Sequence, residues 1–309
     1  MFSQDQILEK LTEPIIAPLS GYTSLPFREL LRQNGFTGLY FPEMINPFEI
    51  ARGKFDKTFS FENDQPYGIQ LFGGFQKGIF QGAIHILLKK ADPVLLDLNM
   101  GCPVKKILKT GGGVRLLERK DDAKSILEDI RKVWKGPLSI KTRIGFTLND
   151  IEETVSFLKE LQVFDLTFIT VHFRTVAEGF SPPPHWELYR HFKDQLNVPL
   201  ILNGGIYSVA HIREIKKNIS PDGIMLARGI LMNPLLFKEK TPSLNEKIDM
   251  AKFFIKKYSE IYGERRLHEI RKFMVFLFKG EIYSKALKEK LFSSTNLEEY
   301  LESFTFYRM

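Results

Sequence analysis

Short runs of apolar and β-branched residues recur along the first three quarters of the chain, and more polar segments separate them. The runs start about 24 to 43 residues apart, which leaves room for a strand, a loop and a return helix in each interval. They occupy residues 14–21, 39–45, 67–73, 95–103, 138–145, 166–175, 199–206 and 223–231. We interpret them as eight parallel strands, a number and spacing typical of a (β/α)8 barrel.

The segments between these runs carry apolar residues at the spacing of amphipathic helices. The clearest helix candidates are residues 27–35, 121–134, 150–161 and 208–218. Asp121 and Asp122 stand in the first turn of the second candidate, where the positive end of the helix dipole favours acidic side chains. The predicted fold class is therefore α/β, a (β/α)8 TIM barrel in which helices return the chain between parallel strands.

The pattern changes near Thr241, where the strand signals stop. Residues 245–292 have the spacing of successive helices, interrupted near Gly263 and Gly280. We therefore predict two domains, a catalytic (β/α)8 barrel over residues 1–240 and a small all-helical domain over residues 241–309.

The chain contains one cysteine, Cys102, in 309 residues. An intramolecular disulfide and a metal site built from several cysteines are thereby excluded, and no other metal-ligand spacing appears. The first residues lack the basic and apolar regions of a signal peptide, and no apolar run approaches the ~18 residues that cross a membrane. We expect a cytoplasmic, soluble monomer that binds neither a metal nor a membrane.

The chain is moderately basic, with 44 Lys and Arg against 37 Asp and Glu, a net charge of +7 and a pI of about 9.2. Many ordinary enzymes carry as much charge, so the total favours a nucleic-acid partner only weakly. Residues 243–309 hold 13 basic and 10 acidic side chains, and so contribute nearly half of the excess. The concentration of positive charge in residues 243–309 favours a polyanionic partner more than the total net charge does.

Polar side chains cluster at the carboxyl ends of the predicted strands, where barrel enzymes carry their active sites. Lys141 and Arg143 lie two residues apart in an otherwise apolar strand, so their side chains share one face. Charged groups are rarely buried without a partner, and this pair therefore favours an anionic or polar ligand. The other polar or glycine-bearing strand ends carry Gln70, Asp97, Asn99, Cys102, His172, Arg174, Asn203, Gly204, Gly205, Ala227 and Arg228.

Glycine-bearing turns follow the last two predicted strands, at residues 203–205 and 227–229. Their backbone N–H groups and one guanidinium would form the usual phosphate site of this barrel. A phosphate site, a lysine in the mouth and a nearby thiol suit FMN, because the lysine would stabilise negative charge on the reduced flavin and Cys102 would supply a proton. Asp97 is expected to support its neighbours rather than to react.

Taken in order, the motifs resemble those of the tRNA-dihydrouridine synthases. The resemblance runs from about Pro14 to Leu301, and DLNMGCPVKK at residues 97–106 is its most specific part. The other matching segments are APLSGYTSLPFR, PEMI, QLFG, GGGVRLL, IKTRIG, VHFRT, NGGI and MLARGILMNPLLF, followed by YGERRLHEIRKFMVFLFKG in the helical domain. The resemblance implies reduction of the C5–C6 bond of specific tRNA uridines to dihydrouridine, with FMN as cofactor and NADPH as reductant.

The resemblance also implies roles for individual residues. Cys102 is expected to protonate C5 of uracil while hydride passes from the flavin to C6. The implied cofactor-binding residues are Pro18, Leu19, Ser20, Gln70, Lys141, His172, Asn203, Gly204, Gly205, Ala227 and Arg228. The residues expected on the substrate side of the mouth are Asn99, Arg143, Arg174, Lys105 and Lys106.

Residues 263–280 are predicted to form one helix with a buried face and a basic face. The buried face would carry Leu267, Ile270, Met274, Leu277 and Phe278, and the basic face Arg265, His268, Lys272 and Lys279. We expect Arg265, Lys272 and Lys279 to contact tRNA phosphates, because a target base must be taken out of folded RNA beside this domain. The alternative is a solvated face that only keeps the domain soluble.

Four features depart from the family pattern. Gly205 stands where an acidic residue is common, Phe173 and Arg115 stand where small residues are usual, and SPPPHW at residues 181–186 replaces a shorter, more polar stretch. We expect a reshaped loop after the sixth predicted strand and retained activity. Two alternatives remain open: another FMN-dependent barrel reductase that acts on a small molecule, of the dihydroorotate or enoate type, and a tRNA-binding protein that has lost catalysis.

Overall fold

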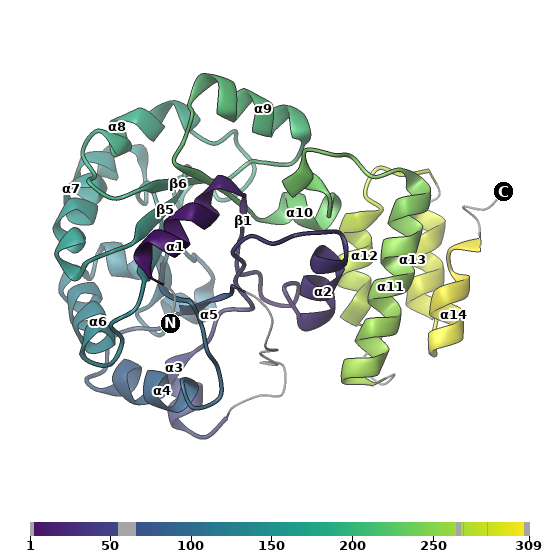
Figure 1. The fold of residues 1–309 in the computed structure, drawn as a ribbon, viewed down its shortest axis with the longest axis horizontal. Coiled ribbons are helices and arrows are strands. Elements are labelled where there is room, and N and C mark those ends of the chain that lie inside the picture. Colours follow the sequence, from purple (N-terminus) through teal and green to yellow (C-terminus); the bar gives the residue numbers. More distant parts are fainter. Residues whose placement is uncertain (1–2, 55–65, 264–266, 268, 283, 306–309) are drawn as a thin grey trace. The chain divides into compact units, whose positions relative to one another are not determined.

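The computed structural model describes residues 3–54, 66–263, 267, 269–282 and 284–305 (Figure 1). These residues divide into two compact units. The barrel unit comprises residues 1–18, 38–205 and 213–226, and the helical unit comprises residues 19–37, 206–212 and 227–309. The domain ranges 1–240 and 241–309 stay a prediction.

Seven parallel strands form the sheet of the barrel unit. In spatial order they are β1 (Ile15–Ile16), β7 (Gly223–Leu226), β6 (Leu200–Asn203), β5 (Phe168–His172), β4 (Leu138–Arg143), β3 (Leu95–Met100) and β2 (Gly68–Leu71). Tyr40 makes parallel bridges to Ile16 in β1 and to Tyr67 beside β2, and so joins the two edges of the sheet. The predicted parallel barrel is confirmed.

The second of the eight predicted strands, residues 39–45, is reduced to isolated bridges. Ile16 N donates to the Leu39 carbonyl at 3.0 Å and Phe41 N donates to the Ile16 carbonyl at 3.0 Å. Tyr40 and Pro42 face the other side, where the Tyr40 carbonyl accepts from Gly68 N at 2.9 Å, and because proline has no N–H, Pro42 cannot donate to β2. The prediction of a full strand was wrong, although a barrel element does lie at this place.

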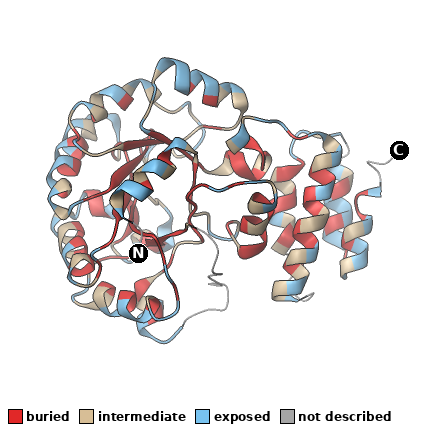
Figure 2. Ribbon diagram, in the orientation of Figure 1, coloured by how far each residue is buried: buried red, intermediate tan, exposed pale blue. Residues whose placement is uncertain are grey.

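Helices connect the strands and cover the sheet. Those that lie in the barrel unit are α1 (Gln4–Glu9), α3 (Pro47–Ala51), α4 (Ile79–Leu87), α5 (Lys105–Leu108), α6 (Lys120–Val133), α7 (Ile151–Leu161) and α8 (Tyr189–Lys193), and α9 (Val209–Asn218) begins in one unit and ends in the other. Every strand residue is buried except Lys141 in β4, whereas the helices expose their outer faces (Figure 2). Burial on both faces is the reason that these strands read as continuous apolar runs.

The helical unit contains α2 (Leu25–Gln33), α10 (Arg228–Met232), α11 (Leu244–Tyr262), α12 (Arg271–Leu277), α13 (Ser284–Ser293) and α14 (Leu297–Glu302). A capping box formed by Ser243 and Glu246 starts α11, and Gly263, with φ 75°, ends it. Phe27 of α2 packs edge-to-face on Phe273 of α12 at 5.2 Å between ring centroids. The predicted C-terminal helices are confirmed, and the early helix α2 joins them.

The prediction of a single helix over residues 263–280 was wrong, because α12 covers only Arg271–Leu277. Residues 267, 269 and 270 have 3-10 conformation. The predicted buried face is nevertheless right: Leu267, Ile270, Met274, Leu277 and Phe278 each expose 2% or less of their surface. A 3-10 turn places residues three apart on one side, so the spacing that marked the face does not distinguish the two helix types. None of the described helices combines the length and the apolar character needed to cross a membrane.

Candidate active site

The strand register brings the predicted polar residues to one interior face of the barrel. Gln70 is paired with Asp97, Asn99 with Lys141, and Arg143 with His172, and His172 is in turn paired with Asn203. Since side chains alternate along a strand, residues that share a register row and a parity point to the same side. The convergence expected from the sequence is therefore present along β2, β3, β4, β5 and β6.

A chain of hydrogen bonds runs across the floor of this mouth. Asp97 accepts from Ser139 Oγ at 2.6 Å and from Gln70 Nε2 at 2.7 Å. Gln70 Oε1 accepts from Asn99 Nδ2 at 2.7 Å, and Asn99 Oδ1 accepts from the backbone N of Cys102 at 3.0 Å. Burial raises the pKa of Asp97 to about 6, and the bonds from Ser139 and Gln70 limit the rise. Asp97 is thus hydrogen-bonded to its neighbours, its supporting role stays a prediction, and Ser139 is a further member that the sequence did not single out.

Cys102 lies in the turn after β3 and is partly exposed. Its carbonyl accepts from Val114 N at 3.1 Å, so the turn is held from both sides of the residue. Burial raises the thiol pKa above its ordinary value of 9.0, while a backbone hydrogen bond from Val104 and the charges of Lys141 and Arg143 act in the other direction. A thiol with a raised pKa stays protonated at neutral pH, and it can therefore donate a proton.

Lys141 and Thr170, a register pair on β4 and β5, present polar groups to the barrel interior. Burial lowers the pKa of Lys141 to about 8, with Arg143 adding to the effect. Within the part of the chain that the structure describes, the Lys141 ammonium has no hydrogen bond or ion pair, and the buried Thr170 hydroxyl has no hydrogen-bond partner. A buried polar group without a partner is costly, so the buried Thr170 and the half-buried Lys141 beside it suit a polar ligand. Sequence reasoning missed Thr170, although it stands two residues before His172 and hence on the same face.

Arg143 is buried and is surrounded by carbonyl groups. Its Nη1 donates to the carbonyls of Thr175 and Gly179 at 2.6 and 2.9 Å, and its Nε donates to the Gly101 carbonyl at 3.2 Å. The Phe180 ring lies 4.9 Å from the guanidinium carbon, in cation–π geometry. Arg143 therefore ties the loop after β5 to the turn that carries Cys102, and its expected contact with uracil stays a prediction.

Arg174 and His172 anchor the other end of the loop after β5. Arg174 Nε donates to the Pro182 carbonyl at 2.6 Å, and Arg174 Nη1 lies 3.1 Å from His172 Nε2. The Phe180 ring stacks on the imidazole of His172 at 5.9 Å between centroids. Both side chains thus have structural contacts, and their roles toward cofactor and substrate stay predictions.

Gly205 and the proline loop at residues 181–186, two of the four unusual sequence features, lie against each other. Gly204 and Gly205 have φ values of 108° and 72°, which favour glycine. A Cβ at Gly205 would meet Pro184 Cγ at 2.6 Å, so the proline loop leaves no room for an acidic side chain there. Phe173 is fully buried against Tyr189 and Phe192 outside the sheet, where a large side chain is accommodated.

The remaining residues of the predicted cofactor site fall in both units. Pro18 belongs to the barrel unit with Asn203, whose side chain donates to the Met225 carbonyl at 2.7 Å. In the helical unit, Leu19 and Ser20 precede α2, Ala227 is the N-cap of α10, and Arg228 donates to the hydroxyl of Tyr207. The cofactor roles of Leu19, Ser20, Ala227 and Arg228 stay predictions.

The lysines expected to meet RNA are exposed where the structure describes them. Lys105 and Lys106 lie on α5, three and four residues after Cys102, and Lys272 and Lys279 lie in and after α12. Arg265 and His268 are outside the described residues. Exposure is what a phosphate contact needs, but a solvated surface has it too.

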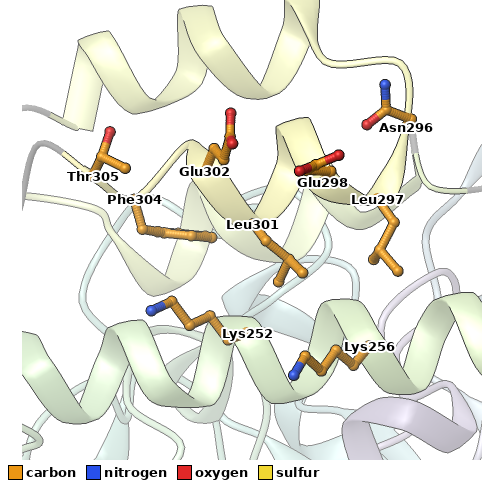
Figure 3. A pocket seen from close by; sticks show the side chains of 9 residues that line it. All are labelled: Lys252, Lys256, Asn296, Leu297, Glu298, Leu301, Glu302, Phe304 and Thr305. Atoms are coloured by element: carbon orange, nitrogen blue, oxygen red, sulfur yellow. The ribbon is translucent and has the colours of Figure 1, made fainter.

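A separate cavity of about 700 Å³ lies in the helical unit between α11 and α14 (Figure 3). Lys252 and Lys256 line it from α11, and Leu297 and Leu301 point toward α11 from α14. Its other lining residues are Asn296, Glu298, Glu302, Phe304 and Thr305. It contains none of the residues predicted from the sequence, and its lysines and glutamates give it mixed charge.

A parallel barrel with polar side chains at the carboxyl ends of its strands defines a (β/α)8-barrel enzyme. A family model described as dihydrouridine synthase matches residues 15–306. The chain belongs to the dihydrouridine synthase family, a family of oxidoreductases.

Curated relatives agree with this assignment, and a solved structure shares the fold. The chain is 31% identical to a probable tRNA-dihydrouridine synthase 1 from Synechocystis sp., over 92% of this chain and 82% of the relative. It is 28% identical to a probable tRNA-dihydrouridine synthase from Aquifex aeolicus, over 95% of each chain. Histamine dehydrogenase from Rhizobium sp. 4-9 has a similar fold, with a TM-score of 0.53, 13% identity and coverage of 81% of this chain and 51% of that chain.

Proposed function

We propose that this chain reduces the C5–C6 double bond of specific uridines in tRNA, with FMN as cofactor and NADPH as reductant. The observation that carries the proposal is the match of the dihydrouridine synthase family model to residues 15–306. It is supported by the sole cysteine of the chain, a protonated thiol in the mouth of the barrel beside Lys141 and Arg143.

The polar groups without partners in the barrel interior fit a flavin. The Lys141 ammonium would neutralise the negative charge of the reduced ring, and the Thr170 hydroxyl offers one hydrogen bond next to it. Gln70 and His172 would contact the ring or ribityl chain, with Pro18, Leu19 and Ser20 against it. Asn203, Gly204, Gly205, Ala227 and Arg228 would hold the phosphate.

FMN reduced by NADPH supplies a hydride for C6 of the uracil ring. As the C5–C6 bond is reduced, negative charge develops toward C5 and O4, which Asn99 and Arg143 would stabilise. Cys102 then gives its thiol proton to C5 and becomes a thiolate, which regains a proton from water. Because burial keeps the thiol protonated at neutral pH, the acid is ready before substrate binds.

The RNA would be held by cations outside the mouth. Lys105 and Lys106 follow the thiol on α5 and would meet phosphates beside the target nucleotide. Lys272 and Lys279, with Arg265 as a further candidate, would add contacts that carry no sequence information, while Arg174 would act on the substrate side of the mouth.

The test is an assay with the purified chain, FMN, NADPH and tRNA that lacks dihydrouridine. We expect one dihydrouridine to form for each NADPH oxidised. We also expect the purified protein to show a flavin absorption band at about 450 nm. Protein without bound flavin, even after addition of FMN, would contradict both the proposal and the small-molecule reductase alternative. Flavin reduction without tRNA turnover would favour that alternative, and tRNA binding without either reaction would indicate lost catalysis.

A further inference from the structure

Asp97 is the most deeply buried acid of the mouth, with 1% of its surface exposed, and the proposed reaction gives it no role. We propose that Asp97 is a positioning residue that, through Gln70 and Asn99, fixes the backbone of the turn carrying Cys102. The value of this role for catalysis rests on the proposed function of Cys102. The hydrogen bonds that link Asp97 to the turn do not depend on that function.

The argument starts from which groups can donate. An ionised carboxylate only accepts hydrogen bonds, whereas a backbone N–H only donates. The chain of bonds has a carboxylate, Asp97, at one end and the N–H groups of Gly101 and Cys102 at the other, both of which meet Asn99 Oδ1. Between these ends stand two side-chain amides, each of which could be turned either way.

With both ends fixed, only one orientation of the two amides satisfies every group. Gln70 must turn its NH2 toward Asp97, which leaves its oxygen toward Asn99. Asn99 must then turn its NH2 toward Gln70 and its oxygen toward Gly101 and Cys102. Asp97 thus closes the chain in the direction that the two N–H groups require, and Ser139 Oγ, which donates to its second oxygen at 2.6 Å, holds the carboxylate in place.

The burial of this carboxylate supports a specific use. Burial is unfavourable for a charge, and an apolar residue would fill the same interior position of β3 without that cost. The bonds from Ser139 and Gln70 counteract the rise in the pKa of Asp97 to about 6, so the group is mostly ionised at neutral pH. If this position of β3 only had to be filled, an ionised hydrogen-bond acceptor would not be needed there.

Amide hydrogen exchange at Gly101 and Cys102 reports directly on the proposed end of the chain. Asp97→Ala removes the acceptor for Gln70, so Gln70 is released, its support of Asn99 is lost and the hold on the turn weakens. We expect exchange at these two amides to become about three- to tenfold faster, the change in population that the loss of one hydrogen bond produces. Exchange at Leu98 in the middle of β3 should change less, because its ladder is intact.

Asp129→Ala is the matched control. Asp129 is a buried carboxylate of α6 with 2% of its surface exposed, and it accepts from Gly78 N at 2.8 Å. Its loss should destabilise the barrel unit and speed exchange at Gly78. The ratio of the exchange rates at Gly101 and Cys102 to the rate at Leu98 should stay as in the wild type. A purely structural role for Asp97 would make the two variants behave alike at the turn.

Asp97→Asn is the conservative variant, because one oxygen can still accept from Gln70 while its NH2 donates to Ser139 Oγ. We expect exchange at Gly101 and Cys102 within about twofold of the wild type, a change smaller than one hydrogen bond. If Asp97→Ala does not fold, Gln70→Leu breaks the same chain in the middle and should give the same faster exchange.

Unchanged exchange at the turn in Asp97→Ala, or equal acceleration in Asp97→Asn, would overturn the positioning role. The measurement needs neither flavin nor tRNA. Failure of the proposed function would leave the exchange result standing, and failure of the exchange result would leave the reaction to be tested separately.

Discussion

The barrel mouth and the helical unit carry the predicted functional residues in opposite ways. In the mouth, Asp97, Gln70 and Arg143 are buried and joined by short hydrogen bonds to named partners. In the helical unit, Lys272 and Lys279 are exposed. The difference teaches that the chemistry of the mouth depends on a few fixed orientations, whereas RNA binding by the helical unit would depend on the sum of interchangeable charges.

The largest effect is expected at the thiol. Cys102→Ala should bind FMN and accept electrons from NADPH as the wild type does, yet reduce tRNA uridine at least about a hundredfold more slowly, the usual scale for loss of a general acid. Cys102→Ser should retain a trace, because a hydroxyl is a weaker acid. Single-turnover kinetics with pre-reduced flavin measure the step, and undiminished turnover in Cys102→Ala would falsify the assigned role.

The next largest effect is expected in the pH dependence of the free energy of unfolding. The buried Asp97 and the more exposed Glu246 should contribute to it with opposite signs. The native pKa of Asp97, about 6, lies above its ordinary 3.8, so the folded state binds this proton more tightly than the unfolded state does. The stability of the wild type relative to Asp97→Asn should therefore fall by about 2 to 3 kcal/mol as pH rises from 4 to above 6, and then level off.

Urea unfolding of both proteins across this pH range measures the difference. Glu246, the capping residue of α11, supplies the control of opposite sign. Its pKa is lowered to about 2, chiefly by Lys240, so its contribution is lost as pH falls through that value. A difference between wild type and Asp97→Asn that does not vary between pH 4 and 6 would mean that Asp97 is not the buried acid described.

A smaller effect, about tenfold, is expected at Lys141. Its charge should strengthen the binding of reduced FMN through one charge-assisted contact. Because burial lowers its pKa to about 8, the charge is present below that pH and is lost as pH rises through it. Affinity for reduced FMN should fall through this range in the wild type and stay low and level in Lys141→Met. Equal pH profiles for the two proteins would remove Lys141 from the flavin site.

The smallest effect is expected in the helical unit. Replacing Lys272 and Lys279 with Ala should reduce the salt dependence of tRNA binding by up to about two charges and leave flavin reduction unchanged; adding Arg265→Ala should extend the loss to about three. The matched control replaces Lys252 and Lys256, which line the cavity between α11 and α14. If the control lowers the slope and the test variant does not, the RNA lies along that cavity instead.

The sequence predicted the mouth better than the helical unit for a physical reason. A lysine and an arginine inside an apolar strand, such as Lys141 and Arg143, need an explanation, and period-two alternation already places them on one face. Thr170 escaped notice because threonine is common in strands, and its missing partner becomes visible only once its neighbours are placed. The apolar run at residues 39–45 does not reveal its reduction to bridges, to which Pro42 contributes because it lacks an N–H for β2.

The helical unit was harder to predict because its signals are not unique. The spacing of Leu267, Ile270 and Met274 identified a buried face but not where α12 begins. Exposed lysines look the same in sequence whether they meet RNA or water. The association of α2 with the C-terminal helices rests on contacts such as Phe27 with Phe273, between segments almost 250 residues apart, which no local pattern shows.

The most direct test of the account is a map of dihydrouridine in tRNA from a strain that lacks this protein, complemented either with the wild type or with Cys102→Ala. We predict that deletion removes dihydrouridine from one or a few defined positions, that the wild type restores it there, and that Cys102→Ala does not. Unchanged dihydrouridine after deletion, with no other synthase in the strain, or full restoration by Cys102→Ala, would contradict the account.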